Sequence, residues 1–598
     1  MPPGMALTHL RSLQSIPRRI TTYWLPRRQA TPNCHAYSTT FDPRNWDYEI
    51  EKKSYSLIAP QYYNFARDVI DSWAQKEKAG LRGDNPALWW INDKGQELKW
   101  SYQEVAYQSK LVANVLMGPC GLKPNDIVIV VLPRIPQWWA INVGAIRSGV
   151  ILSPGTTLLR PSDLQYRLNA AEAKCIITNA DCADHVDQVV DKCPLLKTKV
   201  IVGEKRAGWL NYEELLQKST DNFECINSLA TDPMTVFFTS GTTGAPKMTE
   251  HTHSSYGLGH IITAKYFLSL QPSDVMWNLS DTGWAKCAWS SLFAPWIAGA
   301  TVFVQDSPRF DPHDAVKILA NKPINVFCAP PTAVRLMQVE HEFSMVRKSV
   351  QAGFLRHAVS GGEPVNPEML EEWYEGTGLK LLEGYGQTET TFLCGTYNSI
   401  KQKPGSMGKA APGVNVQVVD DHGVILPPGK EGNIGVRVKP QRPVGLFSRY
   451  IDDESRMKSV FVGDFYLTGD RAVVDEEGYI WFVGRADDVI LSSGYRIGPF
   501  EVESALLEHP AVLESAVVSS PDQTRGEVVK AFVTLTEDYK DSNREALVTE
   551  LQEHTKNVTA PYKYPRKIQF VDTLPKTVSG KIRRVELRNM EWGRKTAD

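Results

Sequence analysis

The segment Thr239-Ser240-Gly241-Thr242-Thr243-Gly244-Ala245-Pro246-Lys247 is a loop rich in hydroxyl groups and glycine, and it directly follows the apolar run Met234–Phe238. The apolar run predicts a buried strand. Hydroxyl donors, glycines that adopt positive φ without strain and one lysine are well suited to surround phosphate oxygens. The segment therefore predicts a strand that leads into a loop holding the phosphates of a nucleotide.

This loop is not a Walker A motif. That motif has Gly immediately before its Lys and Ser or Thr immediately after it, whereas Pro246 precedes Lys247 here and Met248 follows it. Pro246 also lacks a backbone N–H that would donate to a phosphate. An ordinary kinase or P-loop ATPase is therefore disfavoured. The alternative to a nucleotide loop is a surface turn rich in Thr and Gly.

Further segments follow this loop in an order that matches a known superfamily. They are Glu383–Glu389, Tyr466–Asp470, Gly484–Asp488 with Ser493–Arg496, and Pro575–Lys581. With the loop, and over about residues 55 to 590, they resemble the adenylate-forming superfamily, which includes acyl-CoA synthetases, luciferase-like enzymes and peptide-synthetase adenylation domains. Ser280–Trp284 and Thr559–Pro565 are most similar to the mitochondrial medium-chain acyl-CoA synthetases.

The resemblance implies an acid–thiol ligase that uses ATP, Mg²⁺ and coenzyme A. In such enzymes a carboxylate attacks the α-phosphate of ATP, which gives acyl-AMP and pyrophosphate, and the acyl group then passes to coenzyme A. The protein aligns the attack and neutralises the developing charge. Medium-chain or aromatic carboxylic acids are the expected substrates.

Two alternatives belong to other classes of function. One is a non-catalytic protein that binds acyl nucleotides on the same fold, but Lys581 and Glu389 are both present. The other is an adenylation enzyme that passes the acyl group to a carrier domain. No carrier module is found before Asp598, which favours coenzyme A as the acceptor.

Composition favours a soluble globular protein with more than one domain. The 598 residues exceed a single hydrophobic core, and 42% hydrophobic with 22% charged residues is ordinary for this class. A net charge of −2 gives no general attraction to nucleic acid. The longest apolar runs, such as Ile127–Leu132, are too short for a transmembrane anchor. Nine cysteines without a C-x-x-C pair favour buried thiols over zinc sites or disulfides.

The first 41 residues have the composition of a mitochondrial transit peptide. They contain five Arg, no Lys, many Ser and Thr, and no acidic residue before Asp42. Pro17, Arg18 and Arg19 interrupt the only apolar run that would suit a secretory signal. The chain is therefore expected in the mitochondrial matrix, and a disordered basic tail is the alternative.

The pattern of apolar runs predicts an α/β fold. From about residue 125, short β-rich runs alternate with helical patterns, as in Ile127–Leu132 followed by Gln137–Arg147. Such alternation is typical of βαβ units in parallel sheets. Residues 414–484 instead combine alternating strands with Pro/Gly turns, which predicts an antiparallel, barrel-like subdomain. We expect both parts to form one large N-terminal domain over residues 42–486.

A smaller α+β pattern follows Arg485. A helix near Phe500–Glu508, strands at Leu513–Ser519 and Val528–Leu535, and a helix near Arg544–Lys556 are expected there. The resemblance implies that residues 487–598 form a mobile C-terminal domain with its hinge at Asp487.

The resemblance also implies roles in nucleotide binding. Tyr385 lies against adenine, Thr388 contacts the α-phosphate, Glu389 ligates Mg²⁺, Asp470 accepts hydrogen bonds from the ribose, and Arg485 reaches the same nucleotide. An aromatic face, a hydroxyl donor and a hard carboxylate ligand suit the first three tasks. The expected nucleotide-binding set is Thr239, Ser240, Gly241, Thr242, Thr243, Gly244, Ala245, Pro246, Lys247, Glu383, Gly384, Tyr385, Gly386, Gln387, Thr388, Asp470, Arg485 and Lys581.

Lys581 matches the lysine that carries the adenylation step in the superfamily, and Thr388 and Glu389 complete the expected catalytic set. A mobile ammonium group bridges carboxylate and α-phosphate oxygens while negative charge develops. A solvated surface lysine is the alternative, because residues 556–595 contain eleven Lys or Arg against three Asp or Glu.

The expected coenzyme A site lies in the C-terminal domain. By resemblance it comprises the turn Ser493, Gly494 and Tyr495, with Arg496, Arg525 and Lys556 near the phosphates. Glycine allows close backbone approach, and three cations suit a polyanionic ligand. Basic residues on a solvated face are the alternative.

The expected acyl pocket includes Trp284, Gly361 and Gly386. Acetate-activating relatives carry Trp at the position of Gly386, so its absence implies room for several methylenes, each worth about 0.8 kcal/mol when buried. Trp284 as an ordinary core residue is the alternative.

Overall fold

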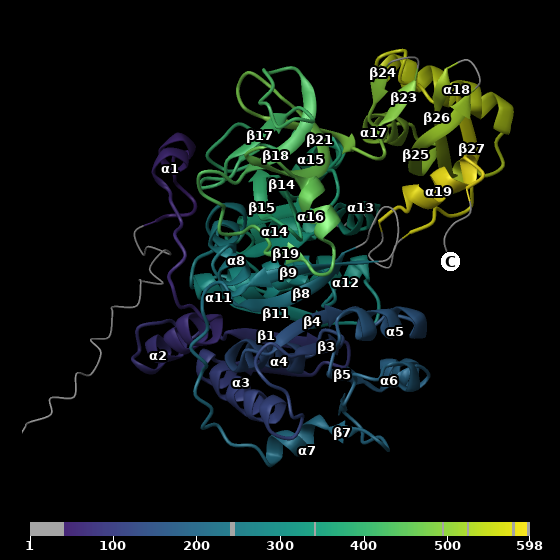
Figure 1. Ribbon diagram of the computed structural model, residues 1–598. Coiled ribbons are helices and arrows are strands. Elements are labelled where there is room, and N and C mark those ends of the chain that lie inside the picture. Colours follow the sequence, from purple (N-terminus) through teal and green to yellow (C-terminus); the bar gives the residue numbers. More distant parts are fainter. Residues whose placement is uncertain are drawn as a thin grey trace, which may run out of the picture.

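The computed structural model describes residues 41–239, 246–339, 343–492, 495–522, 525–576 and 581–594. Two large mixed sheets form most of the chain. Two smaller units follow, a five-stranded sheet drawn in green and a C-terminal unit drawn in yellow, and the C-terminal unit stands to one side (Figure 1). The α/β class expected from the sequence is confirmed.

The first large sheet is parallel in its centre and antiparallel at both edges, where β2, β15 and β16 pair. Its strands in spatial order are β16 (Lys409–Ala410), β15 (Thr391–Gly395), β14 (Leu381–Gln387), β13 (His357–Gly361), β12 (Val326–Ala329), β10 (Val275–Asn278), β11 (Thr301–Asp306), β1 (Leu88–Asn92) and β2 (Glu97–Trp100). The Glu383–Gln387 part of the expected nucleotide motif therefore lies on strand β14.

The second large sheet is also parallel except at one edge. Its strands in spatial order are β19 (Arg449–Tyr450), β9 (Lys247–Thr252), β8 (Pro233–Thr239), β4 (Ile151–Gly155), β3 (Ile127–Val131), β5 (Cys175–Asn179), β6 (Thr198–Val202) and β7 (Leu210–Asn211). Strands β8, β9 and β19 pair antiparallel.

Both sheets are covered on both faces, and the alternation of side chains along the strands shows it. Val128 and Val130 of β3 face the central core between the sheets, whereas Ile129 faces a separate outer core. Trp277 of β10 and Phe303 of β11 likewise face the outer core of the other sheet.

Helices fill these layers. The central layer contains α3 (Tyr102–Met117), α4 (Pro136–Ser148), α8 (His253–Gly257), α9 (His260–Ile262), α10 (Ala285–Ala288) and α11 (Ala294–Ala298). The outer layers contain α5 (Pro161–Ala170) and α6 (Ala180–Asp187) on one side, and α12 (Pro312–Asn321), α13 (Pro331–Val339), α14 (Phe343–Gln351) and α15 (Pro367–Thr377) on the other. Local signals set their ends: Pro136 opens α4, and Gly149 closes it with φ of 71°.

Shorter helices lie outside these layers. They are α1 (Tyr48–Ser54), α2 (Ser72–Lys78), α7 (Tyr212–Gln217) and α16 (Glu454–Val460). The segment before α1 is packed on the large domain, since the Phe41 ring lies 5.8 Å from the Tyr266 ring and the Ser269 hydroxyl donates to the Pro43 carbonyl at 2.6 Å.

The subdomain expected at residues 414–484 is an antiparallel sheet. It consists of β17 (Val416–Val419), β18 (Glu431–Arg437), β20 (Phe461–Val462), β21 (Phe465–Val474) and β22 (Ile480–Arg485). The register of β21 and β22 places Asp470 directly opposite Arg485, two residues that were expected to reach the same nucleotide.

The small C-terminal unit has the expected α+β pattern. Its elements are β23 (Ile490–Ser492), β24 (Tyr495–Ile497), α17 (Pro499–Leu507), β25 (Val512–Asp522), β26 (Gly526–Leu535), α18 (Arg544–Val558), β27 (Lys567–Phe570) and α19 (Arg584–Glu591). It has its own hydrophobic core. In Figure 1, β23 and β24 lie at the opposite end of this unit from α19.

Candidate functional site

The predicted phosphate loop connects two antiparallel strands. Strand β8 ends at Thr239 and β9 begins at Lys247, and these two residues are paired. The loop is therefore the turn of a hairpin, whereas a Walker A loop leads into a helix. Ser240, Gly241, Thr242, Thr243, Gly244 and Ala245 lie outside the described residues. The Pro246 carbonyl accepts a hydrogen bond from the Tyr166 hydroxyl at 2.9 Å.

Asp470 is the centre of a hydrogen-bonded group made from three strands. Its Oδ2 accepts a hydrogen bond from the Tyr385 hydroxyl at 2.5 Å and one from Gln387 Nε2 at 2.7 Å. Arg485 Nε lies 3.3 Å from its Oδ1. The structure thus brings together four residues that sequence reasoning assigned to the nucleotide, from positions up to 100 apart.

A charge from the C-terminal domain also acts on the Asp470 carboxyl. Burial raises the pKa of Asp470, and the Arg485 charge, the two hydrogen bonds and the Lys581 charge oppose that rise. Lys581 therefore lies close enough to Asp470 for its charge to act on it. The expected adenylation lysine and the expected ribose ligand thus interact electrostatically in this orientation of the small domain.

Glu389 is held by a residue that sequence reasoning missed. The Tyr450 hydroxyl donates to Glu389 Oε1 at 2.9 Å, and the Phe447 N–H donates to the Glu389 carbonyl at 2.7 Å. Tyr450 reaches this place because β19 pairs with β9, some 200 residues earlier in the chain. No local pattern around Tyr450 signals that long-range pairing.

The Glu389 carboxylate suits a magnesium ion. Among the described residues, the Tyr450 hydroxyl is its one side-chain hydrogen-bond donor, so Oε2 remains available. Mg²⁺ in nucleotide sites is held by one or two carboxylates together with substrate phosphates and water. No group of three or more His, Cys, Asp or Glu side chains within the described ranges is arranged to hold a metal by itself.

Lys247 and Thr388 lie beside this carboxylate. The pKa of Lys247 is lowered to about 8, mainly by burial and next by the charge of Arg456, whereas the charge of Glu389 opposes this shift. The Thr388 carbonyl accepts a hydrogen bond from His251 Nε2 at 2.7 Å. Burial lowers the His251 pKa to about 3, so a neutral imidazole positions the Thr388 backbone. His251 is a second residue that the sequence did not single out.

The Glu383 carboxyl is buried, and burial raises its pKa to about 8. The groups that shift this pKa include no cation. It begins the motif on β14 but is separate from the Asp470 group. Its assignment to the nucleotide stays a prediction.

Two glycines expected in the acyl pocket lie where the neighbouring backbone leaves no room for a Cβ atom. A Cβ added at Gly386 would lie 2.0 Å from the Thr391 carbonyl oxygen, and one at Gly361 would lie 2.4 Å from the Gly384 carbonyl oxygen. Any side chain at Gly386 therefore requires β14 and β15 to move, because a bulge in their pairing brings the backbones close. A tryptophan at this position would not simply fill a pocket.

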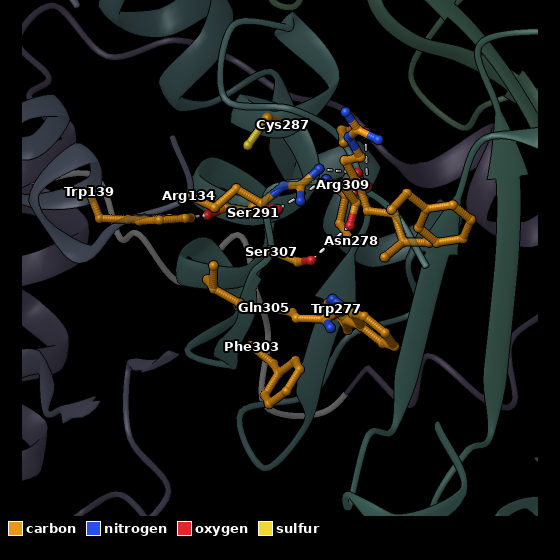
Figure 2. A pocket seen from close by; sticks show the side chains of 14 residues that line it. Arg134, Trp139, Trp277, Asn278, Cys287, Ser291, Phe303, Gln305, Ser307 and Arg309 are labelled. Atoms are coloured by element: carbon orange, nitrogen blue, oxygen red, sulfur yellow. Dashed lines mark hydrogen bonds between the residues drawn. The ribbon is translucent and has the colours of Figure 1, made fainter. Parts of the chain in front are cut away.

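Trp284 is partly exposed and lies outside the hydrophobic cores of the described residues. The alternative of an ordinary core residue is thus disfavoured. Next to its segment, a cavity of about 10 Å³ is lined by Arg134, Asn278, Cys287 and Ser291, among others (Figure 2). That volume suits about one water molecule, and the cavity is too small for an acyl chain.

The expected coenzyme A residues are spread over the small domain. The Tyr495 ring is exposed and stacks on the Tyr562 ring at 4.4 Å. Lys556 pairs with Glu553 at 2.5 Å, and the Arg525 N–H donates to Asp522. Ser493, Gly494 and the Arg496 side chain lie outside the described residues. Ser492 pairs with both Tyr495 and Gly526, so Tyr495 and the residue after Arg525 lie on strands next to β23, and Lys556 lies 4.4 Å from the centre of the Tyr564 ring. The assignment of these residues to coenzyme A stays a prediction.

The expected hinge is held by the last helix. Arg588 of α19 donates to the Asp487 carbonyl at 2.6 Å and to Asp488 Oδ1 at 2.5 Å. On the other side of the junction, Gly498 packs so closely on Val483 that a Cβ would lie 2.0 Å from the Val483 carbonyl oxygen. These contacts fix one orientation of the small domain, with Lys581 towards the nucleotide site.

Every helix in the described ranges is too short or too polar to span a membrane.

Comparisons with known proteins identify the family to which this chain belongs. The sequence model of the AMP-binding enzyme family matches residues 76–450, and that of the AMP-binding enzyme C-terminal domain matches residues 501–581. The human mitochondrial acyl-coenzyme A synthetase ACSM3 is 53% identical over 560 residues, which cover 93% of this chain and 95% of the relative.

Solved structures also match over most of the chain. The anthranilate CoA ligase AuaEII in complex with anthranoyl-AMP superposes with a TM-score of 0.77 at 27% identity, covering 89% of this chain and 98% of the ligase. A benzoate CoA ligase from Burkholderia xenovorans LB400 gives a TM-score of 0.75 at 26% identity, covering 88% and 100%. The resemblance inferred from the motifs is confirmed. The chain belongs to the AMP-binding enzyme family, in the branch of that family that the acyl-CoA synthetases form.

Proposed function

We propose that this enzyme activates medium-chain or aromatic carboxylic acids to acyl-CoA through an acyl-AMP intermediate. The reaction class is that of an AMP-forming acid–thiol ligase, as in its relatives. The observation that carries the site assignment is the group around Asp470, where Tyr385, Gln387 and Arg485 converge and the Lys581 charge acts.

The first step needs alignment and charge neutralisation. The Asp470 carboxylate accepts hydrogen bonds from the ribose hydroxyls, and Tyr385 covers the adenine. Thr388, with its backbone held by His251, donates to the α-phosphate. The substrate carboxylate then attacks that phosphorus and pyrophosphate leaves. Lys581 neutralises the charge that develops on the oxygens between the two reactants.

Glu389 would hold Mg²⁺ together with phosphate oxygens. The ion, when bound, offsets the charge of the triphosphate as it becomes a leaving group. The protein's part is to keep the carboxylate in place, and the Tyr450 hydroxyl and the Phe447 N–H do this from strand β19 and the segment before it.

The second step transfers the acyl group to the thiol of coenzyme A. The cysteines in the described ranges are free, and nearly all are buried, so the acceptor thiol comes from the cosubstrate. We assign the coenzyme to Tyr495, Arg525 and Lys556 with the adjoining Ser493, Gly494 and Arg496. Trp284, Gly361 and Gly386 remain the candidates for the acyl pocket.

Pyrophosphate release against a panel of carboxylic acids, with and without coenzyme A, tests this proposal. We expect release with C6 to C12 acids or benzoate-like acids, and AMP with acyl-CoA as products when coenzyme A is added. Pyrophosphate without any thioester would favour a carrier-domain acceptor. Nucleotide binding without pyrophosphate release from any acid would favour the non-catalytic alternative.

Asp470→Asn is expected to raise the KM for ATP by about tenfold, since the loss of a charge-assisted hydrogen-bonding group costs roughly 1.5–3 kcal/mol. The KM for the acid should stay unchanged. Asp475→Asn is the matched control, because Asp475 pairs with Lys403 on the same subdomain away from the site. Equal KM values for ATP in both variants, with unchanged thermal unfolding, would contradict the ribose role.

We also propose that the enzyme works in the mitochondrial matrix. Residues 1–41 fused to a fluorescent protein should bring it into mitochondria, because the segment is rich in Arg and free of acidic residues. The fusion should resist protease after digitonin opens the outer membrane. A control fusion with the five Arg replaced by Gln should stay in the cytosol, and a cytosolic wild-type fusion would contradict the proposal.

A further inference from the structure

We propose that Arg456 of α16 binds the β- and γ-phosphates of ATP, and then the pyrophosphate product, together with Lys247. The inference rests on the proposed function and adds to it a residue outside every motif that the sequence singled out. It concerns the leaving-group end of the nucleotide.

Arg456 and Lys247 approach the same aromatic ring from different parts of the chain. The Lys247 ammonium lies 5.8 Å from the centre of the Tyr450 ring, and the Arg456 guanidinium lies 5.9 Å from it. The Tyr450 hydroxyl is bonded to Glu389. Two cations and the expected magnesium ligand therefore surround one phenol.

The backbone fixes each partner in this cluster. Strand β9 begins at Lys247 and pairs with β19, where Tyr450 lies opposite Thr249. The Asp453 side chain accepts the Arg456 N–H at 3.0 Å and so starts α16 three residues after Tyr450. The Tyr450 N–H is in turn 3.3 Å from the Met457 sulfur. Arg456 is thus held on the outer side of the phosphate-loop hairpin.

The charges in this cluster are incompletely satisfied by the protein. Arg456 Nε is buried and has no hydrogen-bond partner in the described part of the chain, although a buried guanidinium normally uses its donors. The charges of Arg456 and Arg485 both act on Lys247, against those of Glu389 and Asp453. A polyanion would stabilise these two cations and could accept from the Arg456 donor that lacks a partner among the described residues, and arginine and lysine are the usual ligands of phosphate.

The position within the cluster selects the terminal phosphates. Asp470, the ribose ligand, is acted on by Arg485 and Lys581, whereas Arg456 acts on Lys247. Lys247 ends the phosphate loop, and Arg456 shares with it the Tyr450 ring, whose hydroxyl donates to the expected magnesium ligand Glu389. The adenosine end therefore belongs to Asp470, the α-phosphate to Thr388 and Lys581, and the far end of the triphosphate to Lys247 and Arg456.

Arg456→Met, which keeps an unbranched apolar stem and removes the charged guanidinium, tests the proposal. We expect pyrophosphate binding, measured by calorimetry on the purified enzyme, to weaken about tenfold or more, since each charge-assisted hydrogen bond contributes roughly 1.5–3 kcal/mol. The KM for ATP and the inhibition constant for pyrophosphate should rise in the same proportion. Thioester formation from supplied acyl-AMP and coenzyme A should be unchanged, because that step involves no pyrophosphate.

The same helix offers a matched control. Lys458→Met removes an exposed cation two residues away and should leave all four values unchanged. Arg456→Lys should recover part of the affinity and serves as the test variant if Arg456→Met does not fold. Unchanged pyrophosphate affinity in a folded Arg456 variant, or an equal loss in Lys458→Met, would overturn the proposal. The calorimetric result does not depend on turnover, so it stands even if no acid supports pyrophosphate release and the proposed function itself fails.

Discussion

Replacing Lys581 by alanine is expected to slow acyl-AMP formation by about a hundred- to a thousandfold, the loss typical for removal of one group that stabilises developing charge. Thioester formation from supplied acyl-AMP should remain close to the wild-type rate. The reason is that Lys581 neutralises charge at the α-phosphate, which changes only in the first step. Its charge already acts on Asp470 in the present orientation of the small domain.

The two half-reactions are measured separately, as pyrophosphate release in single turnover and as acyl-CoA formation from synthetic acyl-AMP. Lys576→Ala is the matched control, since Lys576 lies five residues earlier and pairs with Glu514 within the small domain. An equal loss in both half-reactions of the Lys581 variant, or an equal loss in the control, would remove Lys581 from the adenylation step.

Asp487→Pro should leave acyl-AMP formation nearly normal and slow thioester formation by about a hundredfold, the loss that misplacement of a reactant by about 1 Å can cause. In the present orientation the charge of Lys581 acts on Asp470, whereas β23 and β24, which flank the expected coenzyme A turn, lie at the opposite end of the small domain from α19 (Figure 1). We therefore expect that one orientation does not serve both steps and propose that the domain rotates between them.

Proline suits this test because it restricts φ and leaves the backbone contacts of Asp487 in place, although it removes the carboxylate that lies 3.7 Å from Arg485 Nε. Among the described residues, the Asp487 N–H makes no backbone hydrogen bond, and its carbonyl continues to accept from Arg588. Proline holds φ near −65° and also restricts Ala486 before it. Asp487→Ala is the control that removes the side chain and keeps the rotation. If the folded proline variant forms acyl-CoA at the wild-type rate, the hinge lies at another residue.

The sequence alone was sufficient for the fold class, and it supplied the candidate nucleotide ligands, whose roles stay predictions. The alternation from Ile127 to Leu382 follows from the period of side chains on buried strands, and the structure has strands and helices at the expected places. Glycines and hydroxyls at fixed spacing, as in the phosphate loop, are local requirements, because a phosphate is contacted by consecutive residues. Local patterns of this kind can be recognised in the amino-acid sequence without the fold.

Only the tertiary structure decided which residues support those ligands. Tyr450 reaches Glu389 through the pairing of β19 with β9, His251 reaches the Thr388 carbonyl, and Arg456 joins Lys247 across the same ring. Such contacts join positions roughly 60 to 210 residues apart, and their formation depends on strand order and edge pairing. At Gly386, likewise, the sequence indicated space for substrate, and only the structure showed that a side chain there requires β14 and β15 to move apart. Strand order and packing distance are properties of the assembled sheets, and no short segment specifies them.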